Sequence, residues 1–317
     1  MCPGVDLSKA MERCEYDDYI VVEPPINSLT HRTIDVRSPP KVSFCIPTLN
    51  NEKTIDACLK SVISQDYPTI EIVIVDGGSS DDTVEISRAY TDNIVVDGGT
   101  LGSARQTAIE HSTGEVIAIF DDDIMIPHDG WLRNAIQYFN FSDRVSTVWP
   151  VVVAPPHASL IARLYANVWN ITFQDRVLKR RSYFGGGNAL FLRRCIDEIG
   201  GIDRSLHWGE DWDWARKLKD RDYQVVLIRD ALYHNTMNSL REFAKKQVVG
   251  AETFTTNDFA TMGLSKSNLL YEQFVLGPEA MARGLFGERD SSWSLYPLFA
   301  LIRVIAYGSA YLKKALK

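Results

Sequence analysis

Three consecutive carboxylates, Asp121, Asp122 and Asp123, are the residues whose types and spacing are best suited to chemistry. Like charges this close repel one another unless a cation or hydrogen bonds compensate. A hard divalent ion bound by carboxylate and phosphate oxygens is the natural partner. An isolated acidic triplet more often caps a helix, but these residues follow the predicted strand Val116–Phe120, which favours a metal site.

A further acidic position, Asp76, follows the apolar run Ile70–Val75 and precedes two glycines. Glycines permit a close approach of the backbone to a ligand, and an Asp can bind ribose hydroxyls or a base N–H. A tight turn followed by a helix N-cap at Ser80 or Asp81 explains the same residues. The residues alone favour neither interpretation.

Glu210 and Asp211 stand at a predicted helix start, close to Trp208 and Trp212. A carboxylate beside aromatic surface could act as a base next to a platform on which a sugar stacks. The simpler explanation is an acid pair that complements the helix dipole, with the tryptophans in the core.

His234 and Lys246 lie downstream of the predicted strand Gln224–Ile228. His234 could ligate a metal, although a core histidine is the commoner case. Lys246 could meet phosphates, although a lysine on a helix more often lies on a solvated face.

The elements that must position these residues alternate between strands and helices. Strands that are apolar on both faces belong in a parallel sheet covered by helices, so we expect an α/β fold. Ligands in such folds bind outside the carboxyl ends of the strands, where the acidic residues stand. The first four predicted strands are Val42–Ile46, Ile70–Val75, Ile94–Val96 and Val116–Phe120.

The chain is expected to have three parts. Residues 1–40 are a polar surface arm, and 41–250 are the domain of alternating strands and helices, which is regular over 41–125 and looser over 126–250. Residues 251–317 are a helical region. A capping box at Ser239–Glu242 predicts a helix that begins near Leu240.

Composition excludes several classes of protein. The 317 residues are 45% hydrophobic and 24% charged, which is ordinary for a globular protein. A net charge of −7 argues against sequence-independent binding of nucleic acid. Five widely spaced cysteines without a CxxC pair argue against a zinc site or a disulfide framework and favour a reducing, cytoplasmic location.

The order of the motifs resembles that of the family 2 inverting glycosyltransferases. No single motif is specific, but the ordered set is, and it spans about residues 41 to 250. The matching segments are Val42–Glu52, Ile74–Thr83, Gly102–Ile109, Gly114–Asp123, Gly186–Phe191, Gly200–Asp203 and Gly209–Asp211.

The resemblance implies the GT-A fold, a Rossmann-like, mainly parallel sheet flanked by helices, here with added C-terminal helices. It also implies that 41–250 is the catalytic domain, with a nucleotide-binding half (41–125) and an acceptor half (126–250), and that the domain contacts a nucleotide-sugar donor. Gly77 stands where the family often has a second Asp, so contacts to the base are expected to differ. The candidate donor-binding residues, with Lys246 added for its charge, are Pro47, Thr48, Asn50, Glu52, Asp76, Arg105, Asp121, Asp122, Gly187, Asn188 and Lys246.

The resemblance assigns the remaining roles as well. Asp211, with Glu210 beside it, matches the catalytic base. Asp121 and Asp123 match the ends of the DxD motif that holds Mn²⁺ or Mg²⁺, and His234 falls where some members place a further ligand. Trp208 and Trp212 remain the candidate acceptor platform.

The expected reaction is metal-dependent transfer of a hexose from a nucleotide-diphosphate sugar with inversion. Mannose from GDP-mannose is the first choice, and UDP-hexoses follow. The clear base favours a hydroxyl of a lipid-linked or glycan acceptor, whereas a polyprenyl-phosphate acceptor is already anionic and needs no base.

Two other classes of protein remain alternatives. A sugar nucleotidyltransferase shares the parallel sheet and the metal, but the loop after the first strand lacks the expected glycines. A non-catalytic carbohydrate-binding protein on a degenerate transferase fold is opposed by the intact Asp121, Asp123 and Asp211.

The C-terminal segment 291–317 holds four basic residues, no acidic residue and many aromatic and aliphatic side chains. This composition suits a helix that lies in a membrane interface, and equally a terminal helix packed on the protein. Peripheral contact with the cytoplasmic membrane face is therefore one expectation for this segment.

Overall fold

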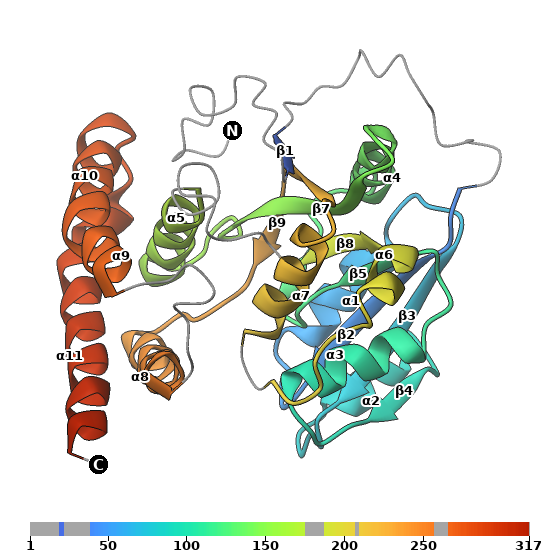
Figure 1. Ribbon diagram of the computed structural model, residues 1–317, viewed down its shortest axis with the longest axis horizontal. Helices are drawn as coiled ribbons and strands as arrows, with labels where there is room; N and C mark the ends of the chain where they lie inside the picture. The colour runs from blue at the N-terminus through green and yellow to red at the C-terminus, as the bar shows by residue number, and fades with distance from the viewer. Residues whose placement is uncertain (1–18, 22–38, 175–186, 207–208, 257–265, 317) are drawn as a thin grey trace. The chain divides into compact units, whose positions relative to one another are not determined.

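The computed structural model describes residues 19–21, 39–174, 187–206, 209–256 and 266–316 (Figure 1). Contacts divide these residues into two compact units. The sheet unit comprises the described residues within 11–152 and 184–234, and the helical unit those within 153–183 and 235–317. The helical unit thus includes 153–183, which interrupt the sheet unit in sequence.

The sheet unit is built on a curled mixed sheet in the order β1-β9-β7-β8-β5-β2-β3-β4, with β6 paired to β9. The pairs β2–β3, β2–β5 and β3–β4 are parallel, as the alternation of strands and helices predicts. The strands β8 and β6 pair in the antiparallel sense. The strand bounds are β1 (Tyr19–Val21), β2 (Val42–Thr48), β3 (Ile70–Asp76), β4 (Ile94–Val96), β5 (Val116–Ile119), β6 (Ile124–Met125), β7 (Val145–Val153), β8 (Ala189–Leu192) and β9 (Gln224–His234).

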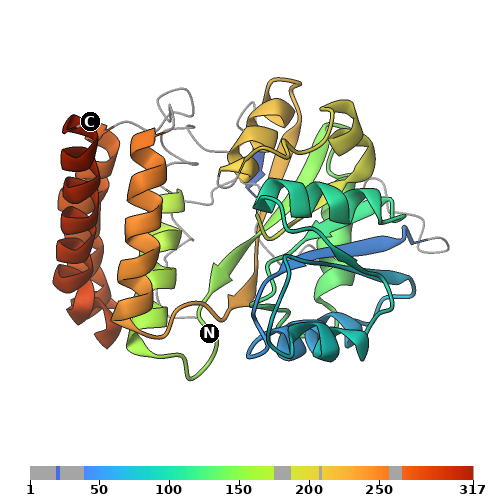
Figure 2. The ribbon, with the colours of Figure 1, turned by 90° about the horizontal axis from the view of Figure 1, so that it is seen from below.

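Helices cover both faces of this sheet, with α3, α6 and α7 on one face and α1 and α2 on the other (Figure 2). The core between them is aromatic and β-branched: Phe44 meets Phe120 edge-on at 5.3 Å, and Phe191 meets Trp214 at the same distance. The helices of this unit are α1 (Ile55–Ile63), α2 (Thr83–Arg88), α3 (Leu101–Glu110), α4 (Trp131–Gln137), the 3-10 turn Tyr138–Asn140, α6 (Arg193–Glu198) and α7 (Glu210–Lys219).

The helical unit packs around an aromatic centre in which Phe243 stacks on Phe299 at 3.9 Å. Where α8 packs on α11, the contact is made by Ala251, Ala306 and Ala310, whose small side chains allow close approach. Its helices are α5 (Leu160–Gln174), α8 (Leu240–Thr256), α9 (Lys266–Tyr271), the π-helical turn Glu272–Leu276, α10 (Gly277–Ala282), the π-helical turn Arg283–Gly287, the 3-10 helix Ser291–Leu295 and α11 (Tyr296–Ala315).

Several local predictions are confirmed, and one element differs in a way that matters for the site. The helix α8 begins at Leu240, and the Ser239 hydroxyl and the Glu242 carboxylate bond each other's backbone N–H at 3.2 Å, which is a capping box. The strand predicted at Gln224–Ile228 continues to His234 as β9. It is longer because its last residues pair with β6.

Candidate active site

The acidic residues gather at the carboxyl ends of the parallel strands. Asp76 ends β3, while Asp121, Asp122 and Asp123 follow β5. These strands flank β2 on its two sides, so their ends share one edge of the sheet. This is the edge at which α/β folds bind ligands.

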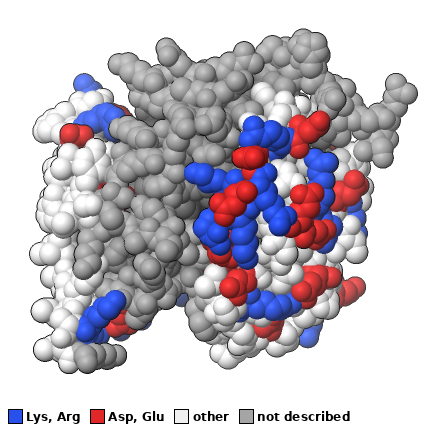
Figure 3. Space-filling view, in the orientation of Figure 1, with Lys and Arg blue, Asp and Glu red and all other residues white. Residues whose placement is uncertain are grey.

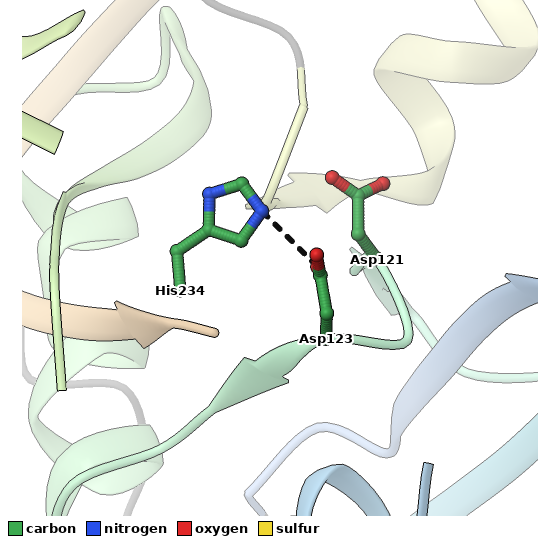
Figure 4. A group of neighbouring side chains, drawn as sticks. All are labelled: Asp121, Asp123 and His234. Carbon is green, nitrogen blue, oxygen red and sulfur yellow. Dashed lines mark ion pairs between the residues drawn. The ribbon is translucent and has the colours of Figure 1, made fainter. Parts of the chain in front are cut away.

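Asp121, Asp123 and His234 form a cluster whose possible ligand atoms all lie within 4.8 Å of one another (Figure 4). His234 Nε2 lies 3.1 Å from Asp123 Oδ1. The pairing of β6 with β9 explains this approach, because Ile124, next to Asp123, is in register with His234. Two residues 111 positions apart in the chain thus meet through one short antiparallel pair.

The residues of the cluster fit a divalent cation. Two carboxylates and an imidazole are the donors that Mn²⁺ accepts readily, and the carboxylates also suit Mg²⁺. Asp123 Oδ1 is buried, with His234 Nε2 3.1 Å away. A buried carboxylate oxygen is costly unless a positive charge offsets its own, and a cation held by the cluster would supply that charge.

Asp122 points away from this cluster toward the loop after β2. Its carboxylate accepts hydrogen bonds from Thr48 Oγ1 at 2.6 Å and from Asn51 Nδ2 at 2.5 Å. Burial raises the pKa of Asp122 to about 6, with Asp123 adding to the rise and the two hydrogen bonds opposing it. Asp122 therefore connects the loop after β2 to the acidic loop, Asp121–Asp123. Asn51 is a contact that the sequence reasoning did not single out, although it stands beside Asn50.

The Asp76 carboxylate is buried and shapes its own loop. It accepts hydrogen bonds from the backbone N–H groups of Gly78 at 3.0 Å and Ser79 at 3.0 Å. Asn50, with a positive φ of 51°, bonds across to Ser80 N at 2.8 Å. The two loops are thereby fixed against each other at the end of β3. The binding of a nucleoside by Asp76 remains a prediction.

Arg105 lies at the centre of the acidic groups and is 4% exposed. Its Nη2 donates to Asp121 Oδ1 at 2.8 Å, and its Nη1 pairs with Glu210 Oε1. Asn188 Nδ2 donates to the other oxygen of Asp121 at 2.9 Å. Burial would raise the pKa of Asp121, but the charges of Arg105 and His234, together with the hydrogen bonds from Asn188 and Arg105, outweigh it and lower that pKa below its ordinary value.

Glu210 and Asp211 occupy different surroundings although they are neighbours at the start of α7. Glu210 is 3% exposed and faces Arg105, whereas Asp211 is partly exposed. A Cβ atom placed on Gly187 would lie 3.8 Å from Asp211 Oδ2 and 3.9 Å from Arg105 Nη2. The segment Gly187–Asn188 thus lies beside both the candidate base and the first Asp of the acidic loop.

Other candidates are more peripheral. Glu52 lies in the loop after β2, where its carboxylate accepts a hydrogen bond from Asp82 N at 3.2 Å, and Pro47 lies within β2. Trp212 is half-buried on α7, and Trp208 lies outside the described residues. Lys246 belongs to the helical unit, where its Nζ lies 5.3 Å above the Tyr165 ring. Their predicted roles stay predictions.

Residues 43–200 match the sequence pattern of glycosyl transferase family 2. The glycosyltransferase AglE of Haloferax volcanii is 30% identical over 218 residues, which cover 66% of this chain and 71% of that protein. The chain belongs to glycosyl transferase family 2. It is thus a glycosyltransferase, as the ordered motifs predict.

Solved structures of other glycosyltransferases have a similar fold. A mannosyltransferase from Pyrobaculum calidifontis, in complex with GDP-mannose and Mn²⁺, is similar with a TM-score of 0.59 and 18% identity, over 85% of this chain and 87% of that one. The glucosyl-3-phosphoglycerate synthase of Mycobacterium tuberculosis, with Mg²⁺ and UDP, gives a TM-score of 0.55 and 17% identity, over 79% and 88%. The predicted GT-A architecture with added C-terminal helices is confirmed.

Proposed function

We propose that the protein transfers a hexose, with inversion, from a nucleotide-diphosphate sugar to a hydroxyl of a lipid-linked or glycan acceptor. The observation that carries the proposal is the convergence of the Asp121–Asp123–His234 cluster, Arg105 and Asp211 at one edge of the sheet. GDP-mannose is the first donor to test, because the similar mannosyltransferase was solved with it. A UDP-hexose is second, because the similar synthase was solved with UDP.

Asp121, Asp123 and His234 would hold a divalent ion, with Mn²⁺ first and Mg²⁺ second. When bound, such an ion neutralises charge that builds on a leaving diphosphate. Arg105 keeps Asp121 ionised and fixed in place by its hydrogen bond. The loops around Asp76 and Asp122 would hold the nucleotide, with Gly187 and Asn188 beside the sugar.

Asp211 is the proposed general base. The acceptor attacks the anomeric carbon from the face opposite the diphosphate, and Asp211 removes the proton of the acceptor hydroxyl as the bond forms. The substitution Asp211→Asn should abolish transfer to a hydroxyl while donor binding remains. Near-normal turnover of this variant would remove Asp211 from the role. Transfer to a polyprenyl phosphate that survives the substitution would instead favour the phosphate acceptor.

The donor can be identified by thermal denaturation of the full chain with Mn²⁺ and either GDP-mannose, UDP-glucose or UDP-N-acetylglucosamine. A ligand at about 100 times its Kd stabilises the folded state by ~2.7 kcal/mol, which is a shift of several degrees in Tm. We expect the largest shift with GDP-mannose and its loss with a chelator. A chain stabilised by no nucleotide sugar would contradict the proposal and favour a non-catalytic carbohydrate-binding protein. Release of pyrophosphate from a nucleoside triphosphate would favour a nucleotidyltransferase.

We further propose that segment 291–317 contacts the cytoplasmic membrane face. By length and composition alone, Ser291–Ala315 qualifies as a membrane-spanning helix among the described residues, because an 18-residue window within it has a mean hydropathy of 1.4. One side of α11 packs on α8 through Ala306 and Ala310, while Leu301 and Ile305 are 54% and 58% exposed. An aliphatic face that ends in Lys313 and Lys314 suits an anionic lipid surface.

A further inference from the structure

Arg105 joins three elements of the sheet unit through one buried guanidinium. It stands on α3, and its two terminal nitrogens reach Asp121 after β5 and Glu210 at the first residue of α7. Its Cζ also lies 5.7 Å above the ring of Trp214, one turn further along α7. A planar guanidinium that binds two carboxylates and stacks on an aromatic ring has a closely defined position.

The start of α7 depends on this contact. The residue before the helix, Gly209, has a φ of 82° and no side chain with which to cap the helix. Glu210, the first helical residue, is instead held by Arg105 in the interior. Because Asp211 is the next residue, the ion pair fixes the turn that carries the proposed base.

The charges of the group explain why Glu210 is required. A guanidinium that is 4% exposed is stable only when nearby anions compensate its lost hydration. Asp121 cannot serve both Arg105 and a divalent cation without sharing its negative charge. Glu210 supplies the second negative charge, and so leaves more of the charge of Asp121 to the metal cluster.

We infer that Glu210 is a positioning residue, which acts through Arg105 on both Asp121 and the turn of Asp211. This inference rests on the proposed function, because it takes Asp211 as the base and Asp121 as a metal ligand. It gives Glu210, a candidate catalytic residue beside Asp211 in the sequence, a role that does not involve the proton. Glu210 would thus couple the donor side of the site to the acceptor side without touching substrate.

The test compares Glu210→Gln, Glu210→Asp and Asp211→Asn in the full chain. The Mn²⁺ affinity is measured by titration calorimetry, and turnover is measured as the Mn²⁺-dependent cleavage of GDP-mannose. In Glu210→Gln the charge of Arg105 is less compensated, so we expect Mn²⁺ affinity to fall about 3- to 10-fold and turnover ~10-fold or more. Glu210→Asp keeps the charge and should restore Mn²⁺ affinity. Asp211→Asn should lose turnover with a smaller change in Mn²⁺ affinity than Glu210→Gln, because Asp211 contributes less than Glu210 to the negative charge around Arg105.

The double variant Arg105→Gln/Glu210→Gln separates charge from folding. It removes both members of the pair, so its Mn²⁺ affinity should lie closer to that of the unaltered chain than Glu210→Gln does. Asp213→Asn is the matched control, because Asp213 is on the same helix and its ion pairs within the described part of the chain are with Arg216 and Lys217. Asp213→Asn should leave both the Mn²⁺ affinity and the turnover unchanged.

Two results would overturn the inference, and they differ from failure of the proposed function. Unchanged Mn²⁺ affinity and turnover in Glu210→Gln would show that Glu210 positions nothing, with the proposed function intact. Turnover that survives Asp211→Asn but disappears in Glu210→Gln, at unchanged Mn²⁺ affinity, would make Glu210 the base. Absence of Mn²⁺ binding by the unaltered chain would reject the proposed metal site itself.

Discussion

At the scale of single residues, neighbours in the sequence have separate tasks. Asp121 and Asp123 face His234, whereas Asp122 between them turns toward Thr48 and Asn51. Asp122 and Asp123 lie in a turn, in which Ile124 N donates a hydrogen bond to Asp121 O at 3.2 Å, and this turn directs neighbouring carboxylates to different partners. Three adjacent carboxylates can therefore serve a metal cluster and a loop contact without competing.

The metal cluster predicts a specific effect of His234→Asn. Removal of one of three ligands should weaken Mn²⁺ binding by ~10-fold or more, measured by calorimetric titration. His128→Asn is the control, because His128 pairs with Asp230 at 3.0 Å and is not part of the cluster. Equal Mn²⁺ affinity in the two variants would exclude His234 as a ligand.

Glu71 predicts how the stability of the fold depends on pH. Partial burial raises its pKa, but hydrogen bonds from Lys41, Ser43 and Thr113 outweigh this and lower the pKa to about 2. A carboxylate whose pKa is lowered by folding stabilises the protein above its unfolded pKa of about 4.5, and this contribution is lost as the pH falls toward 2.

The substitution Glu71→Gln should therefore lower the free energy of unfolding at pH 7 by about 1 to 2 kcal/mol, after allowance for solvent screening. Chemical denaturation across pH should show the difference from the unaltered chain shrinking between pH 4.5 and pH 2. Glu85→Gln, at an exposed position of α2, is the control and should change little. A difference that is constant with pH would contradict this account of Glu71.

At the scale of elements, the strands that carry the site were predictable, and their pairing was only partly so. The apolar runs at β2, β3, β4 and β5 mark each strand, and the parallel order follows from the helices between them. The two-residue strand β6 has no periodic signal, yet its pairing with β9 brings His234 to Asp123. Local patterns do not contain such a long-range pair.

The same limit applies to side-chain partners. The sequence places Glu210 and Asp211 together at a helix start, and both positions were open to the same role. Only the packed structure shows Glu210 bound to Arg105, 105 residues away in the chain, and Asp211 partly exposed. Which of two adjacent carboxylates is buried depends on the angle at which α7 meets the sheet, and composition does not encode that angle.

One glycine fixes the approach of α3 to the segment before α7. A Cβ atom on Gly102 would lie 2.3 Å from the backbone oxygen of Asp203 and 3.0 Å from that of Leu206. Gly102→Ala should therefore cost about 1 to 3 kcal/mol in stability, measured by urea denaturation, because backbone must move. At Gly130, the nearest atom to such a Cβ is 3.8 Å away, so Gly130→Ala is the control. Equal stability of the two variants would show that the close approach is not rigid.

At the scale of the whole molecule, charge is distributed unevenly. The net charge is −7, yet segment 291–317 has four basic residues and no acidic one. On the face shown in Figure 3, positive and negative side chains intermingle over the sheet unit, while the visible surface of the helical unit is largely uncharged. In that unit, polar side chains such as Asp290 and Glu272 are buried, whereas Phe274 and Phe286 are 58% and 85% exposed. The exposed aromatic side chains are the observation in this unit that the membrane proposal draws on.

The membrane proposal predicts that the double substitution Leu301→Asp/Ile305→Asp weakens flotation of the full chain with anionic liposomes. The unaltered chain should bind neutral liposomes less than anionic ones. Substitution is preferable to deletion of 291–317, because Trp293, Tyr296 and Phe299 in that segment belong to the core of the helical unit. Val248→Asp on α8 is the control, since Val248 is 44% exposed. If all variants float alike, α11 is not the lipid contact.

The central claim is that the Asp121–Asp123–His234 cluster holds the donor through a divalent ion. The most direct measurement is calorimetric titration of GDP-mannose into the full chain with Mn²⁺, with a chelator, and in the Asp123→Asn variant. The account predicts that the unaltered chain with Mn²⁺ binds GDP-mannose most tightly. The affinity should be ~10-fold or more lower when a chelator replaces Mn²⁺, and lower by a similar factor in Asp123→Asn with Mn²⁺ present. Binding of equal strength in all three experiments would contradict it.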